Sequence, residues 1–220
     1  MLKNFIFDLD GTIINSSKEV LTCFDKAFKQ AGVDFDQSRL NSDVIGPPLK
    51  EIIRLIAGRD LSDSDISNIT SYFREIYDND TDDVSELYAG IYDFLLNLKK
   101  SDYKLFIATF KPDKPTKRIV SQFGLSMFDD VYSIDKFGKP ITKTDMILDI
   151  LEKYNLEKSE TVMIGDALSD VQAAKKAGVL DVAVLWGYGK DKSSLVNDAT
   201  YVVNNIEELN QCLKLNCQII

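Results

Sequence analysis

Short apolar runs alternate with helical patterns along most of the chain. Residues 90–100, 143–153 and 170–178 repeat their apolar positions at helical spacing. Six apolar runs have the length and composition of buried strands, and they cover residues 5–8, 104–109, 131–134, 161–165, 182–186 and 201–203. Strands and helices in alternation predict an α/β fold, with a doubly wound parallel sheet and right-handed crossovers.

One long segment, residues 15–86, interrupts this alternation. Its apolar residues recur at helical spacing in several stretches, broken by turn residues such as Gly32 and Gly58. We predict three or four helices there and no strand. Residues 1–14 and 87–220 then form a Rossmann-like core, and residues 15–86 form an inserted α-helical cap domain that covers a site and excludes water. Extra helices packed on one face of the sheet are the alternative.

Two aspartates, Asp8 and Asp10, end the first apolar run, and Gly11 and Thr12 follow them. In open parallel sheets, ligands bind beyond the carboxyl ends of the strands. Side chains two residues apart in an extended segment point to the same side. Two neighbouring carboxylates repel each other unless a cation or a shared proton lies between them. The pair therefore indicates a binding site at this edge.

Later polar residues fall at the same edge of the predicted sheet. Thr109 ends the run 104–109, Asp166 follows the run 161–165, and Lys143 opens a helix. Oxygen ligands without histidine or cysteine favour Mg²⁺ over zinc. Thr109 offers a hydroxyl and a backbone amide to an anion, and Lys143 offers a positive charge.

This set of groups suits phosphate chemistry. One aspartate would attack phosphorus to form an aspartyl phosphate. The other, Asp10, would protonate the leaving oxygen and later take a proton from the hydrolytic water. The metal would reduce the repulsion between the carboxylate and the incoming dianion.

The amino-acid composition excludes several kinds of active site and argues against several kinds of binding partner. None of the 220 residues is a histidine, which excludes histidine-based triads, histidine-ligated zinc and imidazole acid/base catalysis. The net charge of -9 argues against binding to nucleic acid or to an anionic membrane surface. No apolar run approaches the roughly 18 residues that a membrane helix needs.

The first residues lead straight into a predicted strand, so we expect no signal peptide. The three cysteines lack metal-ligand spacing and suit a reduced compartment. We therefore expect a cytoplasmic protein, a monomer or homodimer.

The segment Asp8-Leu-Asp-Gly-Thr12 resembles the first motif of the haloacid dehalogenase-like hydrolases. Thr109, Lys143 and the segment from Asp166 to Asp170 resemble the other three motifs in order, and the helical insert resembles the family's cap. The resemblance implies that Asp8 is the nucleophile and Asp10 the acid/base. It implies Mg²⁺ ligands from the Asp8 carboxylate, the Asp10 main-chain carbonyl and Asp166. Asp170 and Thr12 would support these ligands without binding the metal directly. Asp170 would contact the metal's waters or Lys143.

Other segments resemble the phosphoglycolate phosphatase-like branch of that family. These are Thr109-Phe-Lys111-Pro and Gly187-Tyr-Gly189. The branch usually has Ser or Asn where this chain has Phe110, so Phe110 would offer phosphate only its backbone amide. Lys139, in a Lys-Pro pair, is a rival to Lys143 for the phosphate site. Arg74, on a cap helix, is a candidate contact for a substrate anion.

The resemblance implies a Mg²⁺-dependent phosphatase acting on a small phosphorylated metabolite. A 5′-nucleotidase or pyrophosphatase of the same family, or a phosphoglucomutase-like transferase, uses the same groups. A dehalogenase has no need of Asp10, which argues against that activity. A binding protein that has lost turnover is the alternative from a different class, and it would be expected to lack Asp8 or Asp10. The sequence does not choose the substrate.

Overall fold

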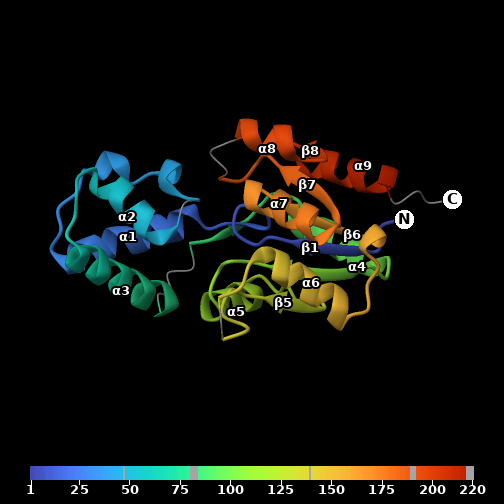
Figure 1. Ribbon diagram of the computed structural model, residues 1–220, viewed down its shortest axis with the longest axis horizontal. Helices are drawn as coiled ribbons and strands as arrows, with labels where there is room; N and C mark the ends of the chain where they lie inside the picture. Colours follow the sequence, from blue (N-terminus) through green and yellow to red (C-terminus); the bar gives the residue numbers. More distant parts are fainter. Residues whose placement is uncertain (47, 80–83, 139, 189–191, 217–220) are drawn as a thin grey trace. The chain divides into compact units, whose positions relative to one another are not determined.

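The computed structural model describes residues 1–46, 48–79, 84–138, 140–188 and 192–216. The chain divides into two compact units, of which the first comprises Met1–Asn15 and Leu87–Ile220 and the second comprises Ser16–Glu86. Figure 1 shows the elements of both units in sequence colours. Among the described helices, none combines the length and the apolar character needed to cross a membrane.

A six-stranded sheet lies at the centre of the first unit (Figure 1). Its strands stand in the order β5-β4-β1-β6-β7-β8, and every neighbouring pair is parallel. The strands are β1 (Asn4–Phe7), β4 (Lys104–Ala108), β5 (Asp130–Tyr132), β6 (Thr161–Gly165), β7 (Leu180–Val184) and β8 (Tyr201–Val203). The predicted doubly wound α/β fold is confirmed.

Helices cover both faces of this sheet. Successive residues of a strand point to opposite faces, and the apolar residues on each face pack against helices. In β1, Phe5 and Phe7 pack in one cluster with apolar residues of α4 (Ile91–Lys100), α5 (Asp113–Gln122) and α9 (Ile206–Asn216). Ile6 packs on the opposite face with α6 (Lys143–Lys153) and α7 (Leu168–Ala177). The remaining helix, α8 (Lys192–Asp198), buries Leu195 in a small cluster.

Strand β7 begins two residues before the position predicted from the apolar run. The strand starts at Leu180 and includes Asp181, a charged residue that masks the strand pattern. Asp181 is buried because its two carboxylate oxygens accept hydrogen bonds from the Thr200 amide and hydroxyl, both at 2.6 Å. Trp186 consequently lies beyond the strand end, on the side of the candidate site.

The second unit contains α1 (Ser17–Ala31), α2 (Leu49–Ala57) and α3 (Asp63–Asn79), with short 3-10 turns η1 (Gln37–Arg39) and η2 (Ser42–Val44). These helices share an apolar core, in which the rings of Phe24 and Phe73 lie 4.3 Å apart. The expectation of no strand in residues 15–86 is wrong at the two ends, where β2 (Ile14–Asn15) and β3 (Glu86–Leu87) form a two-stranded sheet. Runs of two residues are too short to give a periodic signal.

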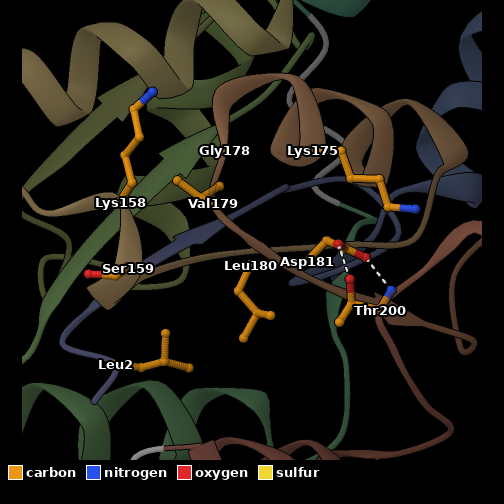
Figure 2. Close-up of a pocket in the computed structure, with 9 residues that line it drawn as sticks. All are labelled: Leu2, Lys158, Ser159, Lys175, Gly178, Val179, Leu180, Asp181 and Thr200. Carbon is orange, nitrogen blue, oxygen red and sulfur yellow. Dashed lines mark hydrogen bonds between the residues drawn. The ribbon is translucent and has the colours of Figure 1, made fainter.

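A cavity of about 430 Å³ lies at the amino ends of the strands (Figure 2). Leu2, Leu180 and Thr200 line it, and they lie at or just before the starts of β1, β7 and β8. This is the edge of the sheet opposite to the predicted site.

Candidate active site

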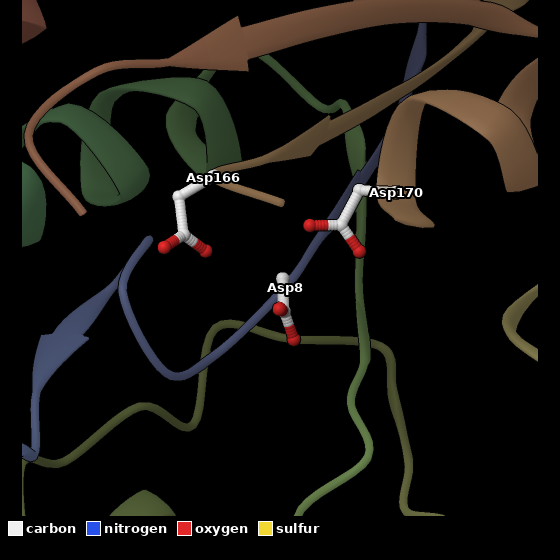
Figure 3. Close-up of side chains that lie close together, drawn as sticks. All are labelled: Asp8, Asp166 and Asp170. Atoms are coloured by element: carbon white, nitrogen blue, oxygen red, sulfur yellow. The ribbon is translucent and has the colours of Figure 1, made fainter. Parts of the chain in front are cut away.

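Three neighbouring strands bring the predicted site residues together. Asp8 directly follows β1, Thr109 directly follows β4 and Asp166 directly follows β6, and β1 lies between the other two strands. Their carboxyl ends therefore meet at one edge. Asp170, in the first turn of α7, joins them, so that one carboxylate oxygen each of Asp8, Asp166 and Asp170 lie within 4.8 Å of one another (Figure 3).

A buried lysine lies against two of these carboxylates. The Lys143 Nζ is 3.0 Å from Asp8 Oδ2 and 2.5 Å from Asp170 Oδ1. Lys143 is the first residue of α6, and a reciprocal capping pair between Thr142 and Asp145 fixes that helix end. The predicted contact of Asp170 with Lys143 is thus present. Asp170 also accepts a hydrogen bond from the Ala167 amide at the start of α7, at 3.1 Å.

The Asp166 carboxylate is oriented from two sides. The Tyr188 amide donates to its Oδ2 at 2.9 Å, and the Thr12 hydroxyl donates to its Oδ1 at 3.4 Å. Gly11, with φ of +80°, and Gly187 both approach this carboxylate so closely that a Cβ at either position would collide with it. Two glycines, separated by 176 positions in the sequence, are therefore required by one side chain.

Crowding of buried acids shifts their proton affinities. Burial raises the pKa of Asp8 to about 8; Lys143 opposes this shift, and Asp170, Asp166 and Asp10 add to it. Burial and the nearby Asp170 raise the pKa of Asp166 to about 7. Burial works against the charge of Lys143, but Asp170 and Asp8 together raise its pKa above the ordinary value. The surroundings therefore favour the charged form of Lys143, whereas burial and neighbouring acids disfavour the charged forms of Asp8 and Asp166.

The loop after β4 provides the groups expected to bind an anion. Thr109 is buried, and its hydroxyl accepts a hydrogen bond from the Lys111 amide at 3.1 Å. Its own amide donates to the Tyr132 carbonyl at 2.9 Å as part of the ladder with β5. The expectation that the Thr109 amide faces an anion is therefore wrong, and its hydroxyl remains.

Phe110 follows Thr109 in the loop after β4, and its backbone amide is the group that was predicted to bind phosphate. That amide donates no hydrogen bond to any other part of the chain that the structure describes. The Phe110 side chain is exposed, and its ring centroid lies 5.1 Å from the Lys143 Nζ.

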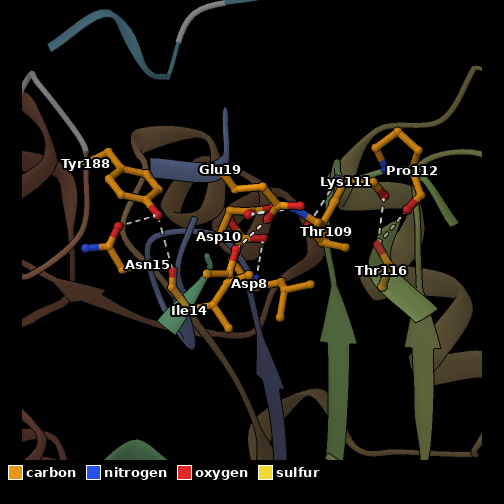
Figure 4. Close-up of polar contacts among 12 residues, drawn as sticks. Asp8, Asp10, Ile14, Asn15, Glu19, Thr109, Lys111, Pro112, Thr116 and Tyr188 are labelled. Atoms are coloured by element: carbon orange, nitrogen blue, oxygen red, sulfur yellow. Dashed lines mark hydrogen bonds and ion pairs between the residues drawn. The ribbon is translucent and has the colours of Figure 1, made fainter. Parts of the chain in front are cut away.

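Asp10 pairs with a residue that the sequence analysis did not place in the site. The Lys111 Nζ lies 3.1 Å from Asp10 Oδ1, and Figure 4 shows this pair beside Asp8 and Thr109. Lys111 was noted only as part of a branch resemblance. Its spacing of two residues from Thr109 was the available signal, since residues two apart at a strand end point to the same side.

Residues after β7 were also missed as contributors to the site. Besides the Tyr188 amide, the Trp186 indole donates to the Thr12 carbonyl at 3.1 Å. The Tyr188 hydroxyl reaches the Asn15 side chain at 3.2 Å. The segment Gly187-Tyr-Gly189 gave the signal, although Gly189 itself lies outside the described residues.

Two further candidates lie outside the unit, or outside the described residues, that hold this cluster. Arg74 is exposed on α3 in the second unit, and its role as a substrate contact stays a prediction. Lys139 lies outside the described residues, so the structure gives a position only to Lys143 of the two rival lysines.

Comparison with known proteins identifies the family. The family model for "Haloacid dehalogenase-like hydrolase" matches residues 5–184, which include every residue of the cluster. The chain is a haloacid dehalogenase-like hydrolase. The resemblance inferred from the four motifs is confirmed.

The relatives of this hydrolase include phosphatases and a kinase. It is 28% identical to the phosphoglycolate phosphatase of Vibrio cholerae over 94% of this chain and 95% of that protein. It is 30% identical to the tyrosine-protein kinase PtkA of Mycobacterium tuberculosis over 94% of this chain and 71% of that protein. A crystal structure of a predicted phosphatase from Clostridium acetobutylicum matches with a TM-score of 0.81 and 28% identity, covering 97% of this chain and 98% of that one. The hydrolase is a phosphatase of this family.

The donor set of the hydrolase fits a hard divalent cation. The oxygens gathered at the edge come from carboxylates, and the chain contains no histidine. Burial and neighbouring acids raise the pKa of Asp8 and Asp166, and a bound cation would oppose that shift. Carboxylate oxygens are the ligands that Mg²⁺ prefers.

Proposed function

We propose that this hydrolase is a Mg²⁺-dependent phosphatase that acts on a small phosphorylated metabolite through an aspartyl-phosphate intermediate on Asp8. The observation that carries the proposal is the position of Lys143. Its ammonium bridges Asp8 and Asp170 while Asp166 stands in the same cluster. A nucleophilic carboxylate, a cation for the phosphoryl oxygens and a carboxylate for the metal are thus available at one edge.

In the first step, a carboxylate oxygen of Asp8 attacks phosphorus, and the bond between phosphorus and the leaving oxygen breaks. Asp10 gives its proton to that oxygen. In the second step, Asp10 takes a proton from water, whose oxygen attacks phosphorus and releases Asp8. The Thr109 hydroxyl, the Phe110 amide and Lys143 bind the transferring phosphoryl oxygens throughout.

Mg²⁺ would be bound by the Asp8 carboxylate, the Asp10 main-chain carbonyl and Asp166. When bound, the ion supplies positive charge that offsets repulsion between these carboxylates and the phosphoryl dianion. Thr12 and the Tyr188 amide orient Asp166 for this task. Asp170 acts behind the site through Lys143.

For the substrate, we propose a small phosphorylated carboxylate such as phosphoglycolate. Support comes from the Vibrio relative, which aligns along nearly its full length and bears the name phosphoglycolate phosphatase. The relative named tyrosine-protein kinase favours a second candidate, transfer of a phosphoryl group to a tyrosine hydroxyl. Both activities begin from phosphoryl transfer, and they differ in the final acceptor.

A substrate panel tests these proposals. Purified protein with Mg²⁺ is incubated with phosphoglycolate, nucleoside 5′-monophosphates, pyrophosphate and sugar phosphates, and released phosphate is measured. We expect the highest kcat/KM for a small phosphorylated carboxylate and none after EDTA treatment. A parallel assay with ATP and tyrosine-containing peptides measures phosphotyrosine. Phosphotyrosine without phosphate release from any metabolite would replace the first candidate by the second.

A further inference from the structure

The loop after β4 contains a buried lysine, Lys111, that contacts the predicted acid/base Asp10. The Lys111 side chain is only 1% exposed, although lysine side chains are seldom fully buried without a partner. Its Nζ lies 3.1 Å from Asp10 Oδ1. The Asp10 side chain is 27% exposed, so that part of it is accessible to solvent. The lysine end of this ion pair is enclosed, and the aspartate end is partly exposed.

The backbone of Lys111 is fixed at several points. Its amide donates to the Thr109 hydroxyl at 3.1 Å. Its carbonyl accepts from the Thr116 hydroxyl at 3.3 Å and from the Ile134 amide at 3.4 Å. A lysine on a fixed backbone with an almost fully buried side chain has few accessible rotamers, so the position of its ammonium is well defined.

The side chain of Asp10 is less enclosed than that of the nucleophile, since it is 27% exposed and the Asp8 side chain is 12% exposed. Asp10 follows β1 in a loop that turns at Gly11. An acid/base must lie within hydrogen-bond reach of the leaving oxygen and then of water. Misplacement by about 1 Å can reduce a rate by roughly 100-fold.

We propose that Lys111 is a positioning residue for Asp10. Its ammonium keeps the Asp10 carboxylate directed at the leaving-group side of the site, and it joins the loop after β1 to the loop after β4. Lys143 and Lys111 thus have separate tasks. Lys143 serves the nucleophile and the phosphoryl group, and Lys111 serves the acid/base. This inference rests on the proposed phosphatase activity.

The test compares Lys111→Met, which keeps the length and removes the charge, with Lys111→Arg, which keeps the charge. Lys117→Met is the matched control, because this nearby lysine is 75% exposed and pairs with Asp113 on α5. Steady-state kcat and KM are measured with p-nitrophenyl phosphate and with the best metabolite of the panel. We expect kcat to fall about 10- to 100-fold in Lys111→Met with KM within about twofold, and partial recovery in Lys111→Arg. Lys117→Met should match the unmodified protein.

A double-mutant cycle separates positioning from other roles. If Lys111 acts through Asp10, then Lys111→Met should add less than about a twofold effect in an Asp10→Asn background. Equal effects in both backgrounds, or a rise in KM with unchanged kcat, would overturn the proposal and assign Lys111 to substrate binding.

Folding and basal activity are checked separately. Thermal melting establishes that each variant is folded, and Lys111→Gln replaces Lys111→Met if the latter does not fold. A folded Lys111→Met or Lys111→Gln variant with normal kcat contradicts the proposal while leaving the phosphatase activity intact. Absence of phosphate release by the unmodified protein from every substrate would instead refute the proposed function.

Discussion

Carboxylates at the two edges of the central sheet have opposite pKa shifts, as Asp130 and Asp8 show. At the amino ends, Asp130 accepts hydrogen bonds from Lys136 and Lys153, each at 2.8 Å. Burial works against its charge, but these lysines lower the pKa of Asp130 to about 2. At the carboxyl ends, burial and neighbouring acids raise the pKa of Asp8 to about 8. At the amino ends, Asp130 is paired with two lysines, whereas at the carboxyl ends Asp8 and Asp170 share the one ammonium of Lys143.

This difference distinguishes charged residues that stabilise the fold from charged residues that belong to the candidate active site. Paired acids at the amino ends stabilise the folded chain, whereas crowded acids at the carboxyl ends are held together at a cost in stability by the rest of the fold. Buried acids with raised pKa values in a common cluster are typical of active sites. The cavity in Figure 2 therefore does not mark the reactive edge, even though it is lined by Lys158 and Lys175.

The largest expected effect comes from replacing one buried aspartate at each edge. Asp8→Asn should reduce phosphate release by about 10,000-fold or more, because the nucleophile is lost. Asp181→Asn, at the amino ends, should keep normal turnover and lose about 1–2 kcal/mol of stability, because its bonds to Thr200 weaken. Phosphate release and urea unfolding measure both variants. Near-normal turnover in Asp8→Asn would show that Asp8 is not the nucleophile and that the acids at the carboxyl ends are not catalytic.

The next largest effect concerns the lysine of the reactive edge. Lys143→Met should lower kcat by about 100- to 1,000-fold and should destabilise the fold by about 3 kcal/mol, because Asp8 and Asp170 lose their shared cation. Lys139→Met should leave both quantities close to the unmodified values. The same assays and unfolding curves decide between the two lysines, and the reverse pattern would assign the phosphate site to Lys139.

A moderate effect is expected in metal affinity. Because Asp8 and Asp166 must lose protons to bind a cation, the apparent Mg²⁺ affinity should rise by up to about tenfold per pH unit for each proton displaced, between pH 6 and 8. Isothermal titration calorimetry in buffers of different ionisation enthalpy measures both the affinity and the protons released. Binding that is independent of pH in this window would show that these acids are not the ligands.

A smaller effect is expected in the stability of the metal-free protein. Folded Asp8 and Asp166 bind protons more tightly than in the unfolded chain, so their contribution is complete below about pH 4 and is lost as pH rises through about 7 to 8. Asp130 has the opposite sign, since its contribution is present above about pH 4 and is lost as pH falls toward 2.

Melting temperatures measured from pH 2 to 9 in EDTA test these signs. Asp8→Asn should flatten the decline between pH 5 and 8, whereas Asp130→Asn should change only the acid side. An Asp8→Asn curve parallel to that of the unmodified protein would show that Asp8 is not the source of the decline.

The smallest effect is expected at Phe110. Phe110→Ser should change stability by about 0.5 kcal/mol or less, since the ring is exposed, and should leave kcat close to normal, since the backbone amide is kept. A large fall in kcat would show that the ring, and not only the amide, serves the reaction.

The sequence alone was sufficient for the fold and for most of the site. Alternating apolar runs and helical stretches predicted the parallel sheet, and the polar residues at the run ends predicted that Asp8, Thr109 and Asp166 meet at one edge. The start of β7 was predicted two residues too late, because a charged residue such as Asp181 is expected to be exposed. The hydrogen bonds from Thr200 that allow its burial are not visible in the sequence. The sequence also assigned the Thr109 amide to an anion, although that amide belongs to the ladder with β5.

What the sequence determined by itself is the chemistry of the chain, since the types of residues at strand ends and the absence of histidine follow from the order of the amino acids. The contact of Asp170 with Lys143 was anticipated from the family resemblance, but only the tertiary structure showed which groups lie against Asp10 and Asp166. Lys111 pairs with Asp10, 101 residues away, and the Tyr188 amide orients Asp166, 22 residues away. Such pairs depend on distances across folded loops, and local periodicity carries no information about those distances.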